Sequence, residues 1–141
     1  MSATYYIRRN ANLTGKDVED LRGAVGWDRM DGHYDRILKR SYTHFSAHEN
    51  DGRLIGFVDV ISEGIADAFL VDLMVHPDYQ GRGVGKALVL HAIDSLRADG
   101  ILTVEVVFEP RLESFYRACG FHIMQSGIID TRPHHKTHDR K

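Results

Sequence analysis

Residues 71–87 read VDLMVHPDYQGRGVGKA, and the order of residue types in this stretch decides the fold. An apolar run ends at Pro77, which cannot donate to a strand ladder, and glycines at 81, 83 and 85 lead into a helical pattern. Glycines let a ligand approach the backbone, and the unpaired N–H groups that begin a helix attract phosphate oxygens. The stretch therefore predicts a phosphate-binding loop with Arg82 and Lys86 as nearby cations. A loop that only turns the chain is the weaker alternative.

Two common phosphate-binding motifs do not fit this loop. In a Walker A motif the glycine ahead of Gly85 would stand at position 80, which is Gln80, and Ala87 replaces the required Ser or Thr. The spacing of the three glycines also fails the G-x-G-x-x-G pattern of dinucleotide-binding folds. The loop therefore belongs to neither of these classes.

Hydrophobic periodicity extends this strand, loop and helix in both directions. Upstream it predicts a strand over 5–9, helices over 15–25 and 33–40, and strands over 42–49, 54–62 and 66–76. After a helix over 83–98 it predicts a strand over 102–108, a helix over 112–119, a final strand over 121–129 and a frayed polar tail over 130–141. The order β-α-α-β-β-β-α-β-α-β indicates an α+β fold with mixed layers, in a single domain over 1–141.

Two local signals set the ends of predicted elements. Thr14, followed three residues later by Asp17, is typical of a helix N-terminus. Asn50, Asp51 and Gly52 supply the positive-φ residues that a tight hairpin requires. We therefore expect a helix to begin after Thr14, and the strands on either side of 50–52 to form a hairpin.

Composition and charge narrow the classes of protein. The chain has 141 residues, 43% hydrophobic and 27% charged, as in ordinary globular domains. Its 18 Lys and Arg against 20 Asp and Glu give a formal charge of −2, which argues against nucleic acid as a partner. Cys119 is the only cysteine, so an internal disulfide and a Cys-rich zinc site are excluded. No run reaches the ~18 apolar residues of a membrane span, and we expect a cytoplasmic protein without metal or membrane.

Two motifs in this arrangement resemble those of one enzyme family. Residues 80–85, QGRGVG, match the Q/R-x-x-G-x-G/A signature of the GNAT superfamily of acyl-CoA-dependent N-acyltransferases. Residues 115–121, FYRACGF, resemble the family's F/L-Y-x-x-x-G-F segment, and the two motifs occur in the family's order. The resemblance implies a GNAT-like fold, in which helices flank a central and mostly antiparallel sheet, and it implies acetyl-CoA as the co-substrate.

The resemblance assigns roles to the loop and to the strand before it. Backbone amides from Gly81 to Lys86 would hold the pyrophosphate of coenzyme A, and the strand edge would pair with the pantetheine arm. Either the Met74 or the Val75 N–H would polarise the thioester carbonyl. Glu109 stands where many members carry an Asn that contacts this arm, so we favour a solvated carboxylate there. The expected cofactor-binding residues are Leu73, Met74, Val75, Gln80, Gly81, Arg82, Gly83, Val84, Gly85 and Lys86.

Tyr116 and Asp72 are the candidates for catalytic residues. By the resemblance, Tyr116 would protonate the leaving thiolate, a task that suits a phenol of pKa ~10, and the alternative is an ordinary packed aromatic. Asp72 interrupts an apolar strand and is either the acceptor of the amine proton or a structural carboxylate, with Asp67 as a weaker candidate. His76 is either a proton relay or, as suits its place before a proline, a loop cap. Cys119 fits a core thiol better than an acyl-cysteine nucleophile.

The family forms its acceptor pocket around the first two helices. Trp27, Asp28 and Tyr34 are the expected substrate contacts there, with Asp31 and Asp35 close in sequence. The carboxylates would attract a cationic amine and the indole would form a wall. A solvated acidic helix face with a packed indole is an equal alternative.

The most specific hypothesis is an N-acetyltransferase that transfers the acetyl group of acetyl-CoA to a primary amine, by direct attack in a ternary complex. The acceptor is a small-molecule or peptide amine whose identity the sequence does not give, and a homodimer is left open. The alternatives are a non-catalytic acyl-CoA sensor and a structural partner with a vestigial pocket.

Overall fold

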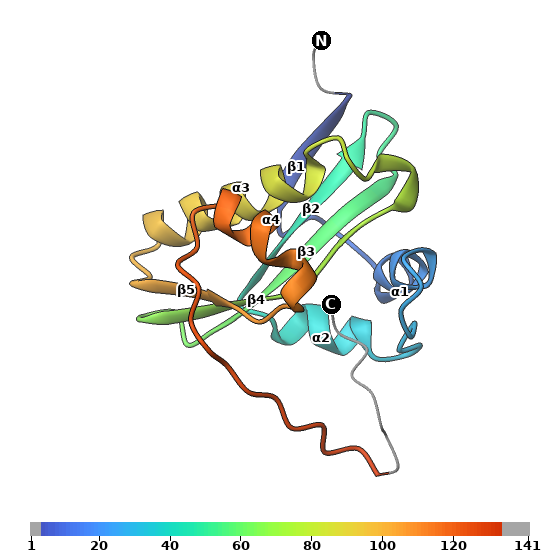
Figure 1. Ribbon diagram of the computed structural model, residues 1–141. Helices are drawn as coiled ribbons and strands as arrows, with labels where there is room; N and C mark the ends of the chain where they lie inside the picture. The colour runs from blue at the N-terminus through green and yellow to red at the C-terminus, as the bar shows by residue number, and fades with distance from the viewer. Residues whose placement is uncertain (1–3, 134–141) are drawn as a thin grey trace.

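The computed structural model describes residues 4–133, which form a sheet with helices on both faces (Figure 1). None of the helices in this part of the chain has the length and apolar character needed to cross a membrane. The elements, in chain order, are β1 (Tyr5–Arg9), α1 (Gly15–Ala24), α2 (Tyr34–Arg40), β2 (Thr43–Glu49), β3 (Leu54–Ser62), β4 (Asp67–Val75), the short 3-10 helix η1 (Pro77–Tyr79), α3 (Val84–Ala98), β5 (Thr103–Val106), the short 3-10 helix η2 (Pro110–Leu112) and α4 (Glu113–Ala118).

The five strands lie in the sheet in the order in which they occur in the chain. β1, β2, β3 and β4 pair antiparallel, and β5 runs parallel to β4. α3 supplies the crossover that such a parallel pair requires. The α+β class and the mostly antiparallel sheet predicted from the sequence are confirmed.

Buried side chains form one core on each face of the sheet. α1 and α2 cover one face, through Val18, Leu21 and Tyr34. α3 and α4 cover the other face, through Val84, Leu88, Val89, Ala92 and Leu96 of α3 and through Cys119, which directly follows α4. The sheet therefore separates two helical layers, and the start of α3 lies in the layer opposite to α1 and α2 (Figure 1).

The final strand predicted over 121–129 is wrong. Residues 121–133 form neither helix nor strand, and Met124 and Ile129 are exposed. β-Branched and aromatic residues favour a strand where a neighbouring ladder and a packed face are available, and β5, four residues long, pairs only with β4 among the described residues. The other predicted elements are confirmed to within two residues at each end. Of the tail predicted over 130–141, residues 134–141 lie outside the described part of the chain.

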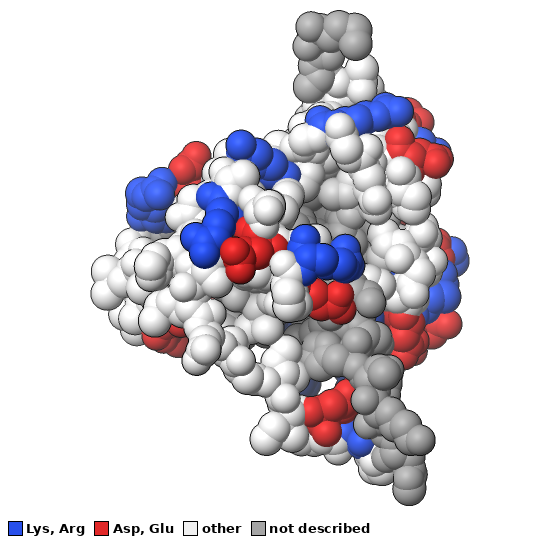
Figure 2. Space-filling model, viewed as in Figure 1, with Lys and Arg blue, Asp and Glu red and all other residues white. Residues whose placement is uncertain are grey.

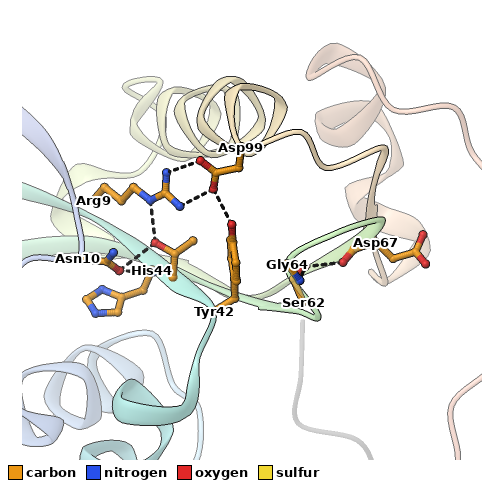
Figure 3. A network of polar contacts seen from close by, with 9 residues as sticks. Arg9, Asn10, Tyr42, His44, Ser62, Gly64, Asp67 and Asp99 are labelled. Carbon is orange, nitrogen blue, oxygen red and sulfur yellow. Dashed lines mark hydrogen bonds and ion pairs between the residues drawn. The ribbon is translucent and has the colours of Figure 1, made fainter.

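A polar network joins the C-terminal end of α3 to β1 and to the start of β2 (Figure 3). The Arg9 guanidinium donates two hydrogen bonds to the Asp99 carboxylate (2.6 and 3.2 Å), and the Tyr42 hydroxyl donates a third (2.8 Å). The hydrogen bonds from Arg9 and Tyr42 lower the pKa of Asp99. Arg9 also donates to the Thr43 hydroxyl (2.9 Å). The network therefore links the C-terminal end of α3 to the strands β1 and β2.

Gly56 of β3 lets the N-terminal part of α3 approach the sheet closely. A Cβ at this position would lie 2.9 Å from Leu88 Cδ1, 3.3 Å from Val84 Cγ1 and 3.3 Å from Ala47 Cβ. All three neighbours are buried, and a core packed at the density of an organic crystal has no space into which they can move. A residue without a side chain is therefore required here.

We expect Gly56→Ala to lower the free energy of unfolding by about 1–3 kcal/mol, because the added methyl group overpacks the contact between β3 and α3. Urea unfolding of the two proteins measures the difference. Gly127→Ala is the matched control, since no atom lies within 4 Å of the added Cβ, and it should change stability by less than about 0.5 kcal/mol. Equal losses in the two variants would contradict the close approach.

Candidate active site

β4 extends beyond the end of its neighbour β5. The parallel register runs from Asp67 opposite Thr103 to Leu70 opposite Val106, where β5 ends, whereas β4 continues to Val75. The outer edge of β4 over residues 71–75 therefore pairs with no strand in the described part of the chain. Unpaired strand edges accept an extended ligand as an added strand.

A β-bulge lies where the two strands part. Two residues of β4, Asp72 and Leu73, stand opposite the single residue Val58 of β3. Asp72 has a φ of 57°, in the left-handed region that non-glycine residues rarely adopt. Bulges bend a strand and re-aim its side chains. This bulge directs Asp72 toward α1 and α2, while Leu73 packs in the core under α3 and α4.

The alternation of hydrogen bonds along β4 shows which amide faces outward. The His76 N–H donates to the Ile55 carbonyl oxygen (2.8 Å), so the neighbouring Val75 belongs to a pair that exchanges no hydrogen bonds with β3. The Val75 backbone therefore points away from β3, and its carbonyl oxygen accepts from the Gln80 side-chain amide (2.9 Å). Met74 points its N–H at β3. Of the two expected oxyanion donors, Val75 is the one that faces outward.

The N-terminal end of α3 presents unpaired backbone donors. The first helical hydrogen bond runs from the Ala87 N–H to the Gly83 carbonyl oxygen (3.0 Å), so the N–H groups of residues 84–86 have no partner within the helix. Gly83 and Gly81 have φ values of 84° and 76°, and no atom lies within 4 Å of the position of a Cβ at either. The glycines thus keep space open before the positive end of the helix, as an anion site requires.

A cavity of about 640 Å³, called the first cavity below, joins the edge of β4 to the start of α3. Every predicted cofactor-binding residue except Arg82 lines it, and the Arg82 guanidinium lies over the Tyr79 ring instead (5.3 Å). Lys86 and Arg111 are the cations on its wall. Arg111 was not among the predicted residues, because it stands in the short helix η2, which carries no motif.

A second cavity of about 850 Å³ meets the first one at Leu73 and Tyr116, which line both. Its walls come mainly from β4, the segment after β5 and residues 128–132, with further residues from β3 (Ile61), α1 (Arg22) and the loop after α1 (Met30). Asp72 and Glu109 are among the side chains that line it. The sequence did not indicate this cavity, because much of its wall consists of irregular segments without periodicity.

Tyr116 lies at the junction of the two cavities and is only 2% exposed. Its ring packs against Phe108, Phe115 and Phe121, with centroids 4.6, 4.9 and 5.7 Å away. Burial raises the pKa of Tyr116 to about 12. The hydroxyl makes no hydrogen bond to any other residue in the described range 4–133. The structure therefore holds a neutral phenol at the junction, with its donor available to a ligand.

A buried polar network holds Asp72. The Tyr34 hydroxyl donates to Asp72 Oδ2 (2.5 Å), and the Arg22 guanidinium lies 3.6 Å from Oδ1 and donates to the Tyr34 hydroxyl (3.2 Å). Tyr34 is fully buried and lines neither cavity. Burial and the adjacent Asp72 carboxylate raise the pKa of Tyr34. The structure thus places Tyr34 behind Asp72, where it can reach a substrate only through that carboxylate.

The remaining predicted residues near α1 and β4 do not come together in one site. Trp27 lines the first cavity. The Asp28 carboxylate accepts from the Met30 N–H (3.0 Å) and lines neither cavity, so the structure does not bring it to the site. His76 Nδ1 accepts from the Asp78 N–H (3.1 Å), which is the arrangement of a loop cap.

Asp67 and Cys119 line neither cavity. Asp67 accepts from the Thr103 hydroxyl (2.5 Å) and so joins β4 to β5 before they part. Cys119 is buried in the core, and burial raises its pKa. Glu109 lines the second cavity and accepts from Arg111 (3.1 Å), which lines the first.

Comparison with known proteins relates this architecture to one family. Residues 14–121 match the family model described as Acetyltransferase (GNAT) family. An uncharacterised N-acetyltransferase from Porphyra purpurea is 35% identical over 120 residues, which cover 82% of this chain and 69% of that protein. A GNAT family acetyltransferase from Streptococcus pneumoniae superposes with a TM-score of 0.77 at 26% identity, over 92% of this chain and 98% of that one. A GNAT family N-acetyltransferase from Escherichia coli, in complex with CoA, superposes with a TM-score of 0.69 at 22% identity, over 82% and 69%.

The raised pKa of Tyr116 predicts a loss of stability in alkali. Between pH 10 and 12 the unfolded chain releases the phenolic proton while the folded protein retains it, so the stability present below pH 10 is lost as the pH rises. The free energy of unfolding should fall in the wild type, relative to Tyr116→Phe, by about 1.4 kcal/mol for each pH unit in this window. Urea unfolding of both proteins at pH 9, 10 and 11 measures this difference. Parallel pH profiles would show that Tyr116 titrates as an ordinary tyrosine.

Proposed function

This chain belongs to the GNAT family of acetyltransferases and is an acyltransferase, and from that premise we propose that it transfers the acetyl group of acetyl-CoA to a primary amine in a ternary complex. One observation carries the proposal. The unpaired amides of α3, the open edge of β4 and the Tyr116 hydroxyl all meet in the first cavity. The CoA complex of the Escherichia coli protein, which has the same fold, supports the choice of donor.

In this proposal the first cavity holds acetyl-CoA. The amides of residues 84–86 and the open glycine loop hold the pyrophosphate, with Lys86 and Arg111 as cations on the wall. The pantetheine arm lies along residues 73–75 as an added strand, because that edge of β4 has no strand partner in the described chain. This arrangement brings the thioester to the junction with the second cavity, beside Tyr116.

The chemical step forms a C–N bond and breaks the C–S bond. The neutral amine attacks the thioester carbon, and the outward N–H of Val75 stabilises the negative oxygen of the tetrahedral intermediate. Asp72, on the wall of the second cavity, accepts the proton that the nitrogen loses, directly or through water. Holding both reactants in adjoining cavities removes much of the entropic barrier.

Tyr116 acts on the leaving group. Its pKa of about 12 lies well above the ~8.5 of an ordinary thiol, a wider gap than that of an unperturbed tyrosine. Complete transfer of the phenolic proton to the thiolate is therefore uphill. The phenol instead donates a hydrogen bond that stabilises the departing thiolate. The proton that the amine released, first taken up by Asp72, finally neutralises the sulfur.

We also propose the cytoplasm as the location of this reaction. Cys119 is the chain's only cysteine and is buried as a free thiol. A fold without disulfides is typical of a reducing compartment.

Isothermal titration calorimetry with acetyl-CoA tests the donor site. We expect binding, and Lys86→Glu should weaken it about tenfold, because the substitution places a negative charge at the proposed pyrophosphate site. Lys39→Glu, an equal charge reversal at an exposed lysine of α2, should leave the affinity unchanged. Absence of binding at millimolar acetyl-CoA would refute the proposal, and binding without turnover on any amine would favour an acyl-CoA sensor.

Tyr116→Phe tests the role of the phenol. The variant keeps the packed ring and loses the donor, so kcat should fall about 100-fold while the affinity for acetyl-CoA stays within about twofold. Thiol release under saturating amine measures kcat, and calorimetry measures the affinity. A variant with the wild-type kcat would remove Tyr116 from the mechanism.

A further inference from the structure

The second cavity leads to the point where the proposed reaction takes place. It shares Leu73 and Tyr116 with the first cavity, and Asp72 is part of its own wall. A molecule in the second cavity therefore reaches the thioester without crossing the site of the donor. This continuity assigns the cavity to the acceptor.

The wall of the second cavity is largely apolar. Ile61 and Phe69, on β3 and β4, are 54% and 39% exposed although their side chains are large and apolar, and Val107 and Ile128 on the irregular segments are also exposed. Figure 2 shows mostly uncharged atoms over β5 and the first part of the segment after α4, whereas charged side chains gather over η2 and α4 and again near the end of that segment. Apolar side chains from separate segments that converge on one cavity are typical of a site for an apolar ligand.

Charged groups of both signs line this cavity: the carboxylates of Asp72, Glu109 and Asp130, and the guanidinium groups of Arg22 and Arg132. Glu109 is paired with Arg111, and Asp130 is paired with Arg132, whereas Asp72 stands at the inner end of the cavity. The cation next to Asp72 is Arg22, only 1% exposed, whose guanidinium is also engaged by Tyr34 and by the Asp28 carbonyl oxygen. Arg22 also lines this cavity, but its guanidinium is almost fully buried and held by these partners, so an incoming ammonium group meets the Asp72 carboxylate at the inner end.

We propose that the acceptor is a primary amine carried on an apolar body, either an aromatic ring or a branched alkyl chain, which lies against Ile61 and Phe69 with its nitrogen toward Asp72. The inference rests on the proposed function, because it names the acceptor of the same transfer. Amines that carry many hydroxyl groups are poor acceptors in this account. Their hydroxyls lose water on entering the cavity and find few polar partners on its apolar wall.

A panel of amines tests the inference on the whole protein. The rate of thiol release from acetyl-CoA is measured with 2-phenylethylamine and isoamylamine, and with glucosamine, ethanolamine and a lysine-containing peptide. We expect kcat/KM to be at least about tenfold higher for the two apolar amines. Ile61→Asn should raise the KM for 2-phenylethylamine about tenfold and leave the KM for acetyl-CoA unchanged. Ile65→Asn is the matched control, since Ile65 is 73% exposed and lines neither cavity, and it should change neither constant.

The outcomes separate this inference from the proposed function. A protein that turns over glucosamine or the peptide in preference to both apolar amines is an acetyltransferase, and the apolar acceptor is refuted. If no amine is turned over, binding of 2-phenylethylamine to the protein saturated with CoA is measured by calorimetry. Binding that Ile61→Asn weakens and Ile65→Asn does not would support the apolar site, and absence of binding would refute it. Failure to bind acetyl-CoA itself would refute the proposed function.

Discussion

The parting of β4 from β5 after the pair formed by Leu70 and Val106 is the constraint on which the rest of the structure depends. Evenly spaced hydrogen bonds join two parallel strands for as long as both strands continue. Here β5 ends early, so the last residues of β4 keep an unpaired outer edge among the described residues. The start of α3 lies at the end of the same strand, held close by Gly56. An open strand edge and the positive end of a helix therefore face one cavity.

The bulge in β4 lies where the two cavities meet. The extra residue directs Asp72 into the polar network with Tyr34 and Arg22, and it sets the alternation that turns the Val75 amide outward. A buried carboxylate is tolerated only where hydrogen bonds and an opposite charge offset its lost hydration. The buried residues of α1 and α2 thus support the strand distortion from behind. The same distortion separates the proposed donor side from the proposed acceptor side.

Signals between residues close in sequence predicted most helices and strands, whereas contacts between residues far apart in sequence determine the geometry of the site. The capping residues Thr14 and Asp17 and the hairpin at 50–52 specify their own elements, because the groups involved are close in sequence. The strand predicted over 121–129 was wrong, because a strand forms only beside a partner strand and the residues of 121–129 do not show whether such a partner exists. The left-handed backbone of Asp72 is also invisible in the sequence, since it depends on register with β3. The glycine loop could be predicted from the sequence, because its residue types themselves indicate phosphate binding.

The most direct test is a titration of the ¹⁵N-labelled protein with coenzyme A, in which ¹H–¹⁵N correlation spectra record the chemical shifts of the backbone amides. The amides of residues 81–86 and of Val75 should show the largest shift changes, since they lie in or next to the wall of the first cavity and lack partners along β5 or within α3. Amides at the opposite end of α3, around Asp99, should remain unchanged. Shift changes confined to other parts of the chain, with residues 81–86 unaffected, would contradict the account.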